Sequence, residues 1–137
     1  MAKTSKGQLV QAALEARRKA VAPYSKFTVG AALLTRDGEV VCGANVESAS
    51  YGLTCCAERI ALFKALTEGR TRFRAIAVVA DWPGGPMPCG ACRQLLAEYA
   101  SDARVWIADA NRPKSVREFT VAELLPGAFS LFGRNTD

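Results

Sequence analysis

The sequence contains no histidine, and only 8% of its 137 residues are aromatic. Histidine is the commonest metal ligand in proteins, so a metal site in this chain must use cysteine or carboxylate groups. The sequence also lacks an apolar run long enough to span a membrane. Its first residues are basic and amphipathic, without the apolar centre of a signal peptide. We therefore expect a cytoplasmic protein that does not interact with a membrane.

The length and composition are those of a small globular protein. A chain that is 50% hydrophobic can bury a sizeable core, but 137 residues leave no room for a second domain. We therefore expect one domain over residues 1–137. The five cysteines, an odd number in a chain expected in a reducing compartment, favour metal binding over a disulfide framework.

The positive charge is concentrated at the start of the chain. The net charge is +5, and residues 1–26 hold six lysines or arginines against one acid, Glu15. A basic segment of this kind can bind a polynucleotide, but here no aromatic residues are interleaved with the basic ones. A solvated helix face is the simpler interpretation, so we expect no nucleic acid partner.

The pattern of apolar residues predicts alternating helices and strands. Helical spacing predicts helices over residues 5–21, 55–68 and 90–99, with a last helical turn over 121–125. Runs rich in apolar or β-branched residues predict strands over residues 28–34, 39–44, 74–80, 104–108 and 116–120. Residues 111–115 are expected to form a turn. This order implies a three-layer α/β/α domain with a mixed five-stranded sheet.

Local signals mark the ends of several elements. Ser5 and Gln8 have the spacing of a capping box, and Asp37-Gly38 is typical of a tight hairpin turn. Gly69 is expected to end the second helix. That helix is apolar on nearly all sides, so we expect it to be buried on more than one side.

Three cysteines and a glutamate stand at the predicted starts of two helices, in Cys56-Ala57-Glu58 and Cys89-Gly90-Ala91-Cys92. Cys89 and Cys92 are three residues apart, so both sulfurs leave one face of a first helical turn. We expect Cys56 in a first turn as well. The positive ends of the two helix dipoles favour thiolates, so the pattern predicts a zinc site of three cysteines.

A fourth zinc ligand is hard to find in the sequence. Cys55 points away from its neighbour Cys56 in a helical turn, and nothing places Cys42 near the metal. A water molecule most simply takes the fourth position, where zinc lowers its pKa to roughly 7. Glu58 is then placed to move its protons. By itself, however, a C-x-x-C pair also fits a redox site or half of a structural zinc ribbon.

Three thiolates around one zinc ion leave a negative charge of about one unit. Positive groups beside the metal are therefore needed or tolerated. Arg59 follows Glu58 and Arg93 follows Cys92, so both are candidates for this compensation.

Four segments in the same order resemble the zinc-dependent cytidine deaminases, and the three-cysteine pattern in so short a chain resembles their small homotetrameric branch. The segments are residues 23–33, 45–47, 56–58 and 88–94. The likeness runs from about residue 23 to residue 129. Thr28 departs from it, since many members have proline there.

The resemblance implies hydrolysis of cytidine and deoxycytidine to uridine and deoxyuridine plus ammonia, a reaction of pyrimidine salvage. Cys56, Cys89 and Cys92 would hold Zn²⁺, and zinc-bound hydroxide would add at C4. Glu58 would carry protons from the water to the ring N3 and to the departing amine. Arg59 would hydrogen-bond the zinc thiolates.

The resemblance also implies substrate contacts. Asn45 and Glu47 would bind the ribose hydroxyls, and the Ala57 amide would bind the pyrimidine O2. Phe27 would pack against the bound nucleoside.

A further implication is a homotetramer whose pockets are shared between subunits. Ala49, Tyr51 and Phe129 match positions that complete a neighbouring subunit's pocket. Phe27, Tyr51 and Phe129 also have an ordinary interpretation as packing residues. Asn45 and Glu47 could simply be turn and strand-end residues.

Three other functions remain open at this point. An aminonucleoside-antibiotic deaminase of the blasticidin type would share the zinc site. A polynucleotide deaminase would use the basic start of the chain. A non-enzymatic zinc-stabilised module would need a fourth protein ligand, Cys42 or Cys55. The preference between cytidine and deoxycytidine, and the roles of residues 81–87 and of the tail after Phe129, leave no signal in the sequence.

Overall fold

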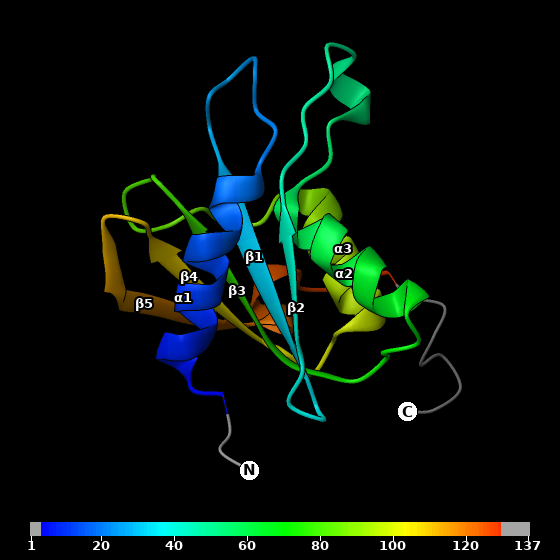
Figure 1. The fold of residues 1–137 in the computed structure, drawn as a ribbon. Helices are drawn as coiled ribbons and strands as arrows, with labels where there is room; N and C mark the ends of the chain where they lie inside the picture. Colours follow the sequence, from blue (N-terminus) through cyan, green and yellow to red (C-terminus); the bar gives the residue numbers. More distant parts are fainter. Residues whose placement is uncertain (1–3, 130–137) are drawn as a thin grey trace.

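The computed structural model describes residues 4–129. Five strands form one sheet in the order β2-β1-β3-β4-β5, with helices on both faces (Figure 1). The strands are β1 (Val29–Thr35), β2 (Val40–Ala44), β3 (Phe73–Ala80), β4 (Arg104–Asp109) and β5 (Arg112–Thr120). The helices are α1 (Lys6–Ala16), α2 (Ala57–Thr67), α3 (Gly90–Tyr99) and α4 (Val121–Leu124), and short 3-10 turns form at Arg17–Lys19 and Tyr51–Leu53. Within that part of the chain, no helix has the length and apolarity needed to cross a membrane.

The sheet is mixed and carries a core on each face. β3 and β4 run parallel, and the other neighbouring strands run antiparallel. Successive residues of a strand point to opposite faces. Leu33 and Val78 therefore pack with α2, α3 and α4, while Leu34 and Val79 pack with Leu9 of α1. The predicted three-layer α/β/α architecture is confirmed.

α1 begins at the predicted capping box. The Ser5 hydroxyl accepts from the Gln8 N–H at 3.1 Å, and the Gln8 side chain accepts from the Ser5 N–H at 2.8 Å. The α-helix ends at Ala16, earlier than predicted. After the 3-10 turn, Val21 leaves the helical path because it forms a β-bridge with Val46.

The predicted hairpin joins β1 and β2. Gly38 has a φ of +91°, a conformation that its missing Cβ makes easy to adopt. Farther along β2, Gly43 lies directly under α2. A Cβ there would stand 2.5 Å from the Ala61 nitrogen and 2.6 Å from the Ala57 oxygen. Glycine therefore allows α2 to lie close against β2.

α2 starts two residues later than predicted, with Cys56 as its N-cap, and Gly69 follows its C-terminal end with a φ of +88°. Ala61 and Leu62 are fully buried, but Phe63 is exposed. The sheet covers one side of α2 and α3 packs against another, in agreement with the prediction that this helix is buried on more than one side. Its remaining face, which carries Phe63, is exposed in the single chain.

The predicted turn over residues 111–115 is wrong for most of its length. β5 begins at Arg112 and pairs antiparallel with β4, placing Val116 opposite Ala108. β5 is an edge strand with mostly exposed polar side chains, so backbone pairing rather than hydrophobic pattern defines it. Pro113 is tolerated because an edge strand leaves some N–H groups unpaired.

Candidate active site

Three sulfur atoms meet where α2 and α3 begin. Cys56 is the N-cap of α2, Cys89 is the N-cap of α3, and Cys92 lies in the first turn of α3. The Cys89 Sγ is 3.7 Å from the Cys56 Sγ and 3.4 Å from the Cys92 Sγ. The structure thus brings the three predicted ligands together, although Cys56 precedes its helix rather than lying in the first turn.

The sulfur cluster fits a zinc ion. Tetrahedral zinc with Zn–S bonds of about 2.3 Å holds its sulfurs about 3.8 Å apart, close to the spacing found here. Among residues 4–129, no fourth histidine, cysteine or carboxylate belongs to the group, and Cys42 and Cys55 lie outside it. Three thiol ligands at two positive helix ends suit a zinc ion with one position left for a water or a substrate.

The thiols influence one another's ionisation. The hydrogen bond with Cys92 lowers the pKa of Cys56 to about 5, and the Arg59 guanidinium acts in the same direction against the effect of burial. The same hydrogen bond, together with burial, raises the pKa of Cys92. One thiolate is therefore favoured by the protein alone, and a bound dication would favour the others.

Glu58 lies beside the sulfurs in the first turn of α2 and is only 6% exposed. Burial, which disfavours the charged carboxylate, raises the pKa of Glu58 to about 7. The nearby Cys56 thiolate also raises it, while a hydrogen bond with Cys92 opposes the shift. A carboxyl group that exchanges its proton near neutral pH is suited to general acid and base work.

Arg59 partly neutralises the sulfur cluster. Its Nη2 lies 3.5 Å from the Cys56 Sγ and donates to the Thr54 carbonyl at 3.3 Å. Its Nε is buried and has no hydrogen-bond partner within the described part of the chain. The guanidinium is therefore held at the thiols, as expected from the sequence.

Arg93, the second predicted compensating group, points elsewhere. Its Nε donates to the Pro88 carbonyl at 2.7 Å, and its Nη1 donates to the Leu124 carbonyl at 3.0 Å. The hydrogen bonds of Arg93 found here therefore go to backbone carbonyls and not to the thiols, so its contribution to the charge at the cluster stays a prediction. Its side chain ties the turn in front of Cys89 to the end of α4 through these two hydrogen bonds.

Asn45 links the end of β2 to the segment that carries Phe27. Its buried side chain accepts from the Val29 N–H at 2.8 Å and donates to the Phe27 carbonyl at 2.8 Å. The backbone of Phe27 is therefore fixed, while its ring remains 36% exposed.

Glu47 is tied to the same segment. Its carboxylate accepts from the N–H groups of Tyr24 and Ser25 at 3.1 and 3.0 Å, and from the Ser25 hydroxyl. The Ser25 hydrogen bonds lower the pKa of Glu47. Glu47 is thus an ionised acceptor at the rim of a hollow of about 380 Å³, which Tyr51 also lines.

The remaining predicted contacts lie on exposed or terminal positions. The 3-10 turn Tyr51–Leu53 lies on an arm that projects from the sheet, two residues after Ala49 (Figure 1). The Tyr51 side chain is 83% exposed. Phe129 is 70% exposed, and its carbonyl accepts from the Gln94 side chain at 2.7 Å. Ala57 is buried as the first residue of α2, where a backbone N–H has no acceptor within the helix.

One contact near these residues had no signal in the sequence. Trp82, in the loop between β3 and α3, packs edge-on against the Phe27 ring, with centroids 6.1 Å apart. A single tryptophan in a loop of glycine and proline matches no periodic pattern. Only the path of the loop shows that it reaches Phe27.

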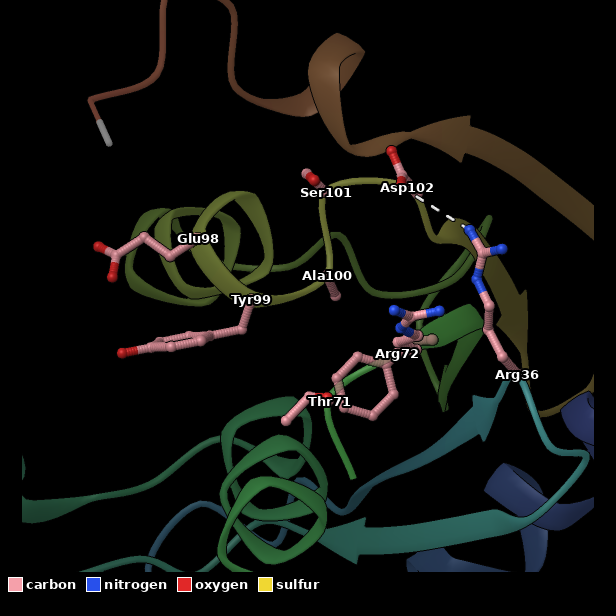
Figure 2. A pocket seen from close by; sticks show the side chains of 9 residues that line it. Arg36, Thr71, Arg72, Glu98, Tyr99, Ala100, Ser101 and Asp102 are labelled. Atoms are coloured by element: carbon pink, nitrogen blue, oxygen red, sulfur yellow. Dashed lines mark ion pairs between the residues drawn. The ribbon is translucent and has the colours of Figure 1, made fainter. Parts of the chain in front are cut away.

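A separate pocket lies at the other end of α3, away from the cysteines (Figure 2). Its volume is about 290 Å³, and it lies between Thr71 and Phe73 on one side and Glu98 and Asp102 on the other. Arg36 and Asp102 form an ion pair at 3.8 Å across it. None of the predicted site residues lines this pocket, so it is not part of the sulfur-centred site.

The fold and the site together define a class: α/β domains with a three-thiol metal centre at two helix starts and a buried carboxylate beside it. The family described as the cytidine and deoxycytidylate deaminase zinc-binding region matches residues 3–108. This chain belongs to that family.

Individual relatives agree with this assignment. A cytidine deaminase of Halalkalibacterium halodurans is 56% identical over 123 residues, covering 89% of this chain and 92% of the relative. The crystal structure of a cytidine deaminase from Burkholderia pseudomallei has a TM-score of 0.87 and 49% identity, covering 91% of this chain and 99% of that one. A blasticidin-S deaminase of Bacillus cereus is more distant, with 32% identity over 110 residues, 74% of this chain and 76% of the relative.

Proposed function

We propose that this protein is a zinc-dependent hydrolase that deaminates cytidine and deoxycytidine to uridine and deoxyuridine with release of ammonia, in pyrimidine salvage. The observation that carries the proposal is the cluster of Cys56, Cys89 and Cys92 with the buried carboxyl group of Glu58 beside it. Such a site supplies both an activated water and a proton carrier.

Cys56, Cys89 and Cys92 would hold the zinc ion. When bound there, zinc lowers the pKa of a water molecule and so supplies a nucleophile at neutral pH. Glu58 would take one proton from the attacking water and deliver it to the ring N3. It would then transfer the second proton of that water to the amine, which would leave C4 as ammonia. A pKa near 7 lets one carboxyl group both accept and donate at each turnover.

The groups around the sulfurs would bind and orient the pyrimidine. The Ala57 N–H lies in the first turn of α2, where a backbone N–H has no acceptor within the helix, and it would donate to the pyrimidine O2. Arg59 stabilises the thiolates through Cys56. Phe27 packs against the base, and Asn45 keeps Phe27 in place.

The ribose would lie between Asn45 and Glu47. Both residues stand at the end of β2, and both hold the loop before β1. Glu47 is ionised, so a ribose hydroxyl can donate to it in addition to Ser25.

We further propose one domain over the whole chain, assembled as a homotetramer in the cytoplasm. Several large apolar side chains are exposed in the single chain: Tyr51, Leu53, Phe63 and Phe129. A monomer seldom leaves so many such groups open without a partner. In the tetramer, Ala49, Tyr51 and Phe129 would complete a neighbouring subunit's pocket.

The test is ultraviolet monitoring of zinc-loaded protein with cytidine, with zinc content measured on the same sample. Conversion to uridine supports the proposal. A zinc-loaded, folded protein without turnover on cytidine or deoxycytidine would contradict it.

A deaminase of an aminonucleoside antibiotic is the second candidate, favoured by the likeness to the Bacillus cereus enzyme. It would use the same zinc and Glu58 chemistry. Comparison of kcat/KM for cytidine and for blasticidin S distinguishes the two candidates. A higher kcat/KM for blasticidin S would favour the antibiotic deaminase.

A further inference from the structure

Trp82 and Phe27 form an aromatic pair at the protein surface. Their ring planes meet at 78°, which is the edge-to-face geometry that aromatic pairs prefer. Trp82 is 57% exposed, so it contributes little to either hydrophobic core. Among the described residues, it is the aromatic neighbour of the Phe27 ring.

The loop that carries Trp82 is anchored to β4 and β5. Asp81 accepts from the Asn111 side chain at 2.6 Å, and the Gly84 carbonyl accepts from Arg117 Nη1 at 3.1 Å. Gly85 has a φ of +87° and lies so close to Ile107 that a Cβ would stand 2.5 Å from its side chain. The loop therefore holds Trp82 in a defined position.

The two rings are supported from different parts of the sheet. Asn45, at the end of β2, fixes the backbone of Phe27 but not its ring. Trp82 follows β3 and contacts the ring itself. Trp82 therefore supports one side of the Phe27 ring, and a bound nucleoside could contact the other side.

We propose that Trp82 is a positioning residue that holds the Phe27 ring for contact with the pyrimidine nucleoside and forms the outer wall of its binding pocket. The proposal rests on the nucleoside contact assigned to Phe27 above. It gives the loop of residues 81–88 a role in substrate affinity, beyond connecting β3 to Cys89.

The first test compares Trp82→Ala with Trp82→Phe in steady-state kinetics on cytidine. Loss of one edge-to-face pair should raise KM about three- to tenfold, with kcat changed less than about twofold. Trp82→Phe should restore most of the affinity because it keeps an aromatic edge. The matched control is Trp106→Phe, since the Trp106 Nε1 donates to Glu118 of β5 at 2.8 Å and Trp106 is not among the residues proposed to bind the nucleoside.

A double-mutant cycle shows whether Trp82 acts through Phe27. If it does, Trp82→Ala should add little to the KM of a Phe27→Ala variant. Additive effects would overturn the positioning role. An unchanged KM in Trp82→Ala, with Phe27→Ala impaired, would overturn it as well and leave the proposed function standing. Failure of the wild type to deaminate cytidine would instead remove the proposed function.

Fluorescence gives a readout that does not depend on turnover. The chain has two tryptophans, so Trp106→Phe leaves Trp82 as the sole indole. Titration with uridine, the product, should change the emission of Trp82. The change should saturate over the same range of uridine concentrations that inhibits cytidine turnover. Constant emission through that range would place Trp82 outside the pocket and overturn the proposal.

Discussion

A carboxyl group can carry protons only if both of its ionisation states are accessible during turnover. Glu58 meets this condition because burial raises its pKa to about 7, whereas an exposed glutamate would stay ionised. The position of Glu58 two residues after Cys56, in the first turn of α2, places this group beside the sulfur atoms. Glu58 therefore has both the position and the pKa that a proton carrier needs.

Glu58→Gln is expected to lower kcat on cytidine at least about 100-fold, because an amide cannot transfer protons. Zinc content and the melting temperature should remain close to those of the wild type, since the buried side chain keeps its shape. Glu68→Gln, on the exposed end of the same helix, is the control. A Glu58→Gln enzyme with near-normal turnover would show that another group moves the protons.

The two cysteines outside the sulfur cluster should be dispensable for the metal. Cys42→Ser and Cys55→Ser are each expected to retain one zinc per chain, because neither side chain belongs to the group of three. Cys92→Ser should lose most of its zinc. Metal analysis after dialysis checks this directly, and loss of zinc from either of the first two variants would indicate a closed structural site.

At the scale of elements, the close contact between β2 and α2 depends on Gly43, which has no side chain. Gly43→Ala is expected to destabilise the fold by about 1–3 kcal/mol, since the new Cβ would press on the backbone of α2. Urea unfolding at constant zinc measures the change. Gly52→Ala is the control because its Cβ would enter open space. Equal stability of the two variants would mean that α2 can shift without cost.

The elements were predictable from the sequence where local signals and burial agree. The capping box at Ser5, the turn at Gly38 and the strand that becomes β3 all combine turn or cap chemistry with apolar residues. The predicted strand over residues 116–120 forms the second half of β5, but residues 112–115 were predicted as a turn because they carry no apolar pattern. Arg112 pairs with Asp109 across an irregularity in the register, so pairing with β4 extends the strand. Tertiary hydrogen bonds decided the structure there, as they often do at a sheet edge.

At the scale of the whole molecule, two impaired variants should regain activity in a mixed oligomer if their subunits share pockets. Phe129→Ala is expected to raise KM about tenfold by removing an aromatic contact from a neighbouring pocket. Mixing it with Glu58→Gln should then restore activity, because some hybrid pockets combine an intact Glu58 with an intact Phe129. Co-expression and assay of the mixed oligomer check this.

No recovery in the hybrids, or full activity in a monomeric form, would contradict shared pockets. Each variant mixed with itself is the control. Sedimentation of the same samples would establish the number of subunits, so that a failed rescue is not confused with a failed assembly.

The sequence indicated the residues of the sulfur cluster better than the residues proposed to contact the nucleoside. Cys56, Cys89 and Glu58 could be read from their spacing, since short motifs at helix starts define both distance and direction. The contacts of Arg93 and Trp82 could not, because each depends on where a loop or terminal helix lies in the folded chain. Such positions are set by packing between distant segments and leave no periodic pattern.

The N-cap position of Cys56 sets a limit on improving this protein for practical use. The Cys56 side chain accepts no capping hydrogen bond, whereas serine or aspartate there would typically gain about 0.5–2 kcal/mol. A stability-guided redesign would therefore select this residue among its first substitutions and would remove a sulfur ligand by doing so. The chain therefore keeps a less stabilising N-cap at the start of α2 because Cys56 belongs to the sulfur cluster. Substitutions that raise the thermal stability must be sought elsewhere in the molecule.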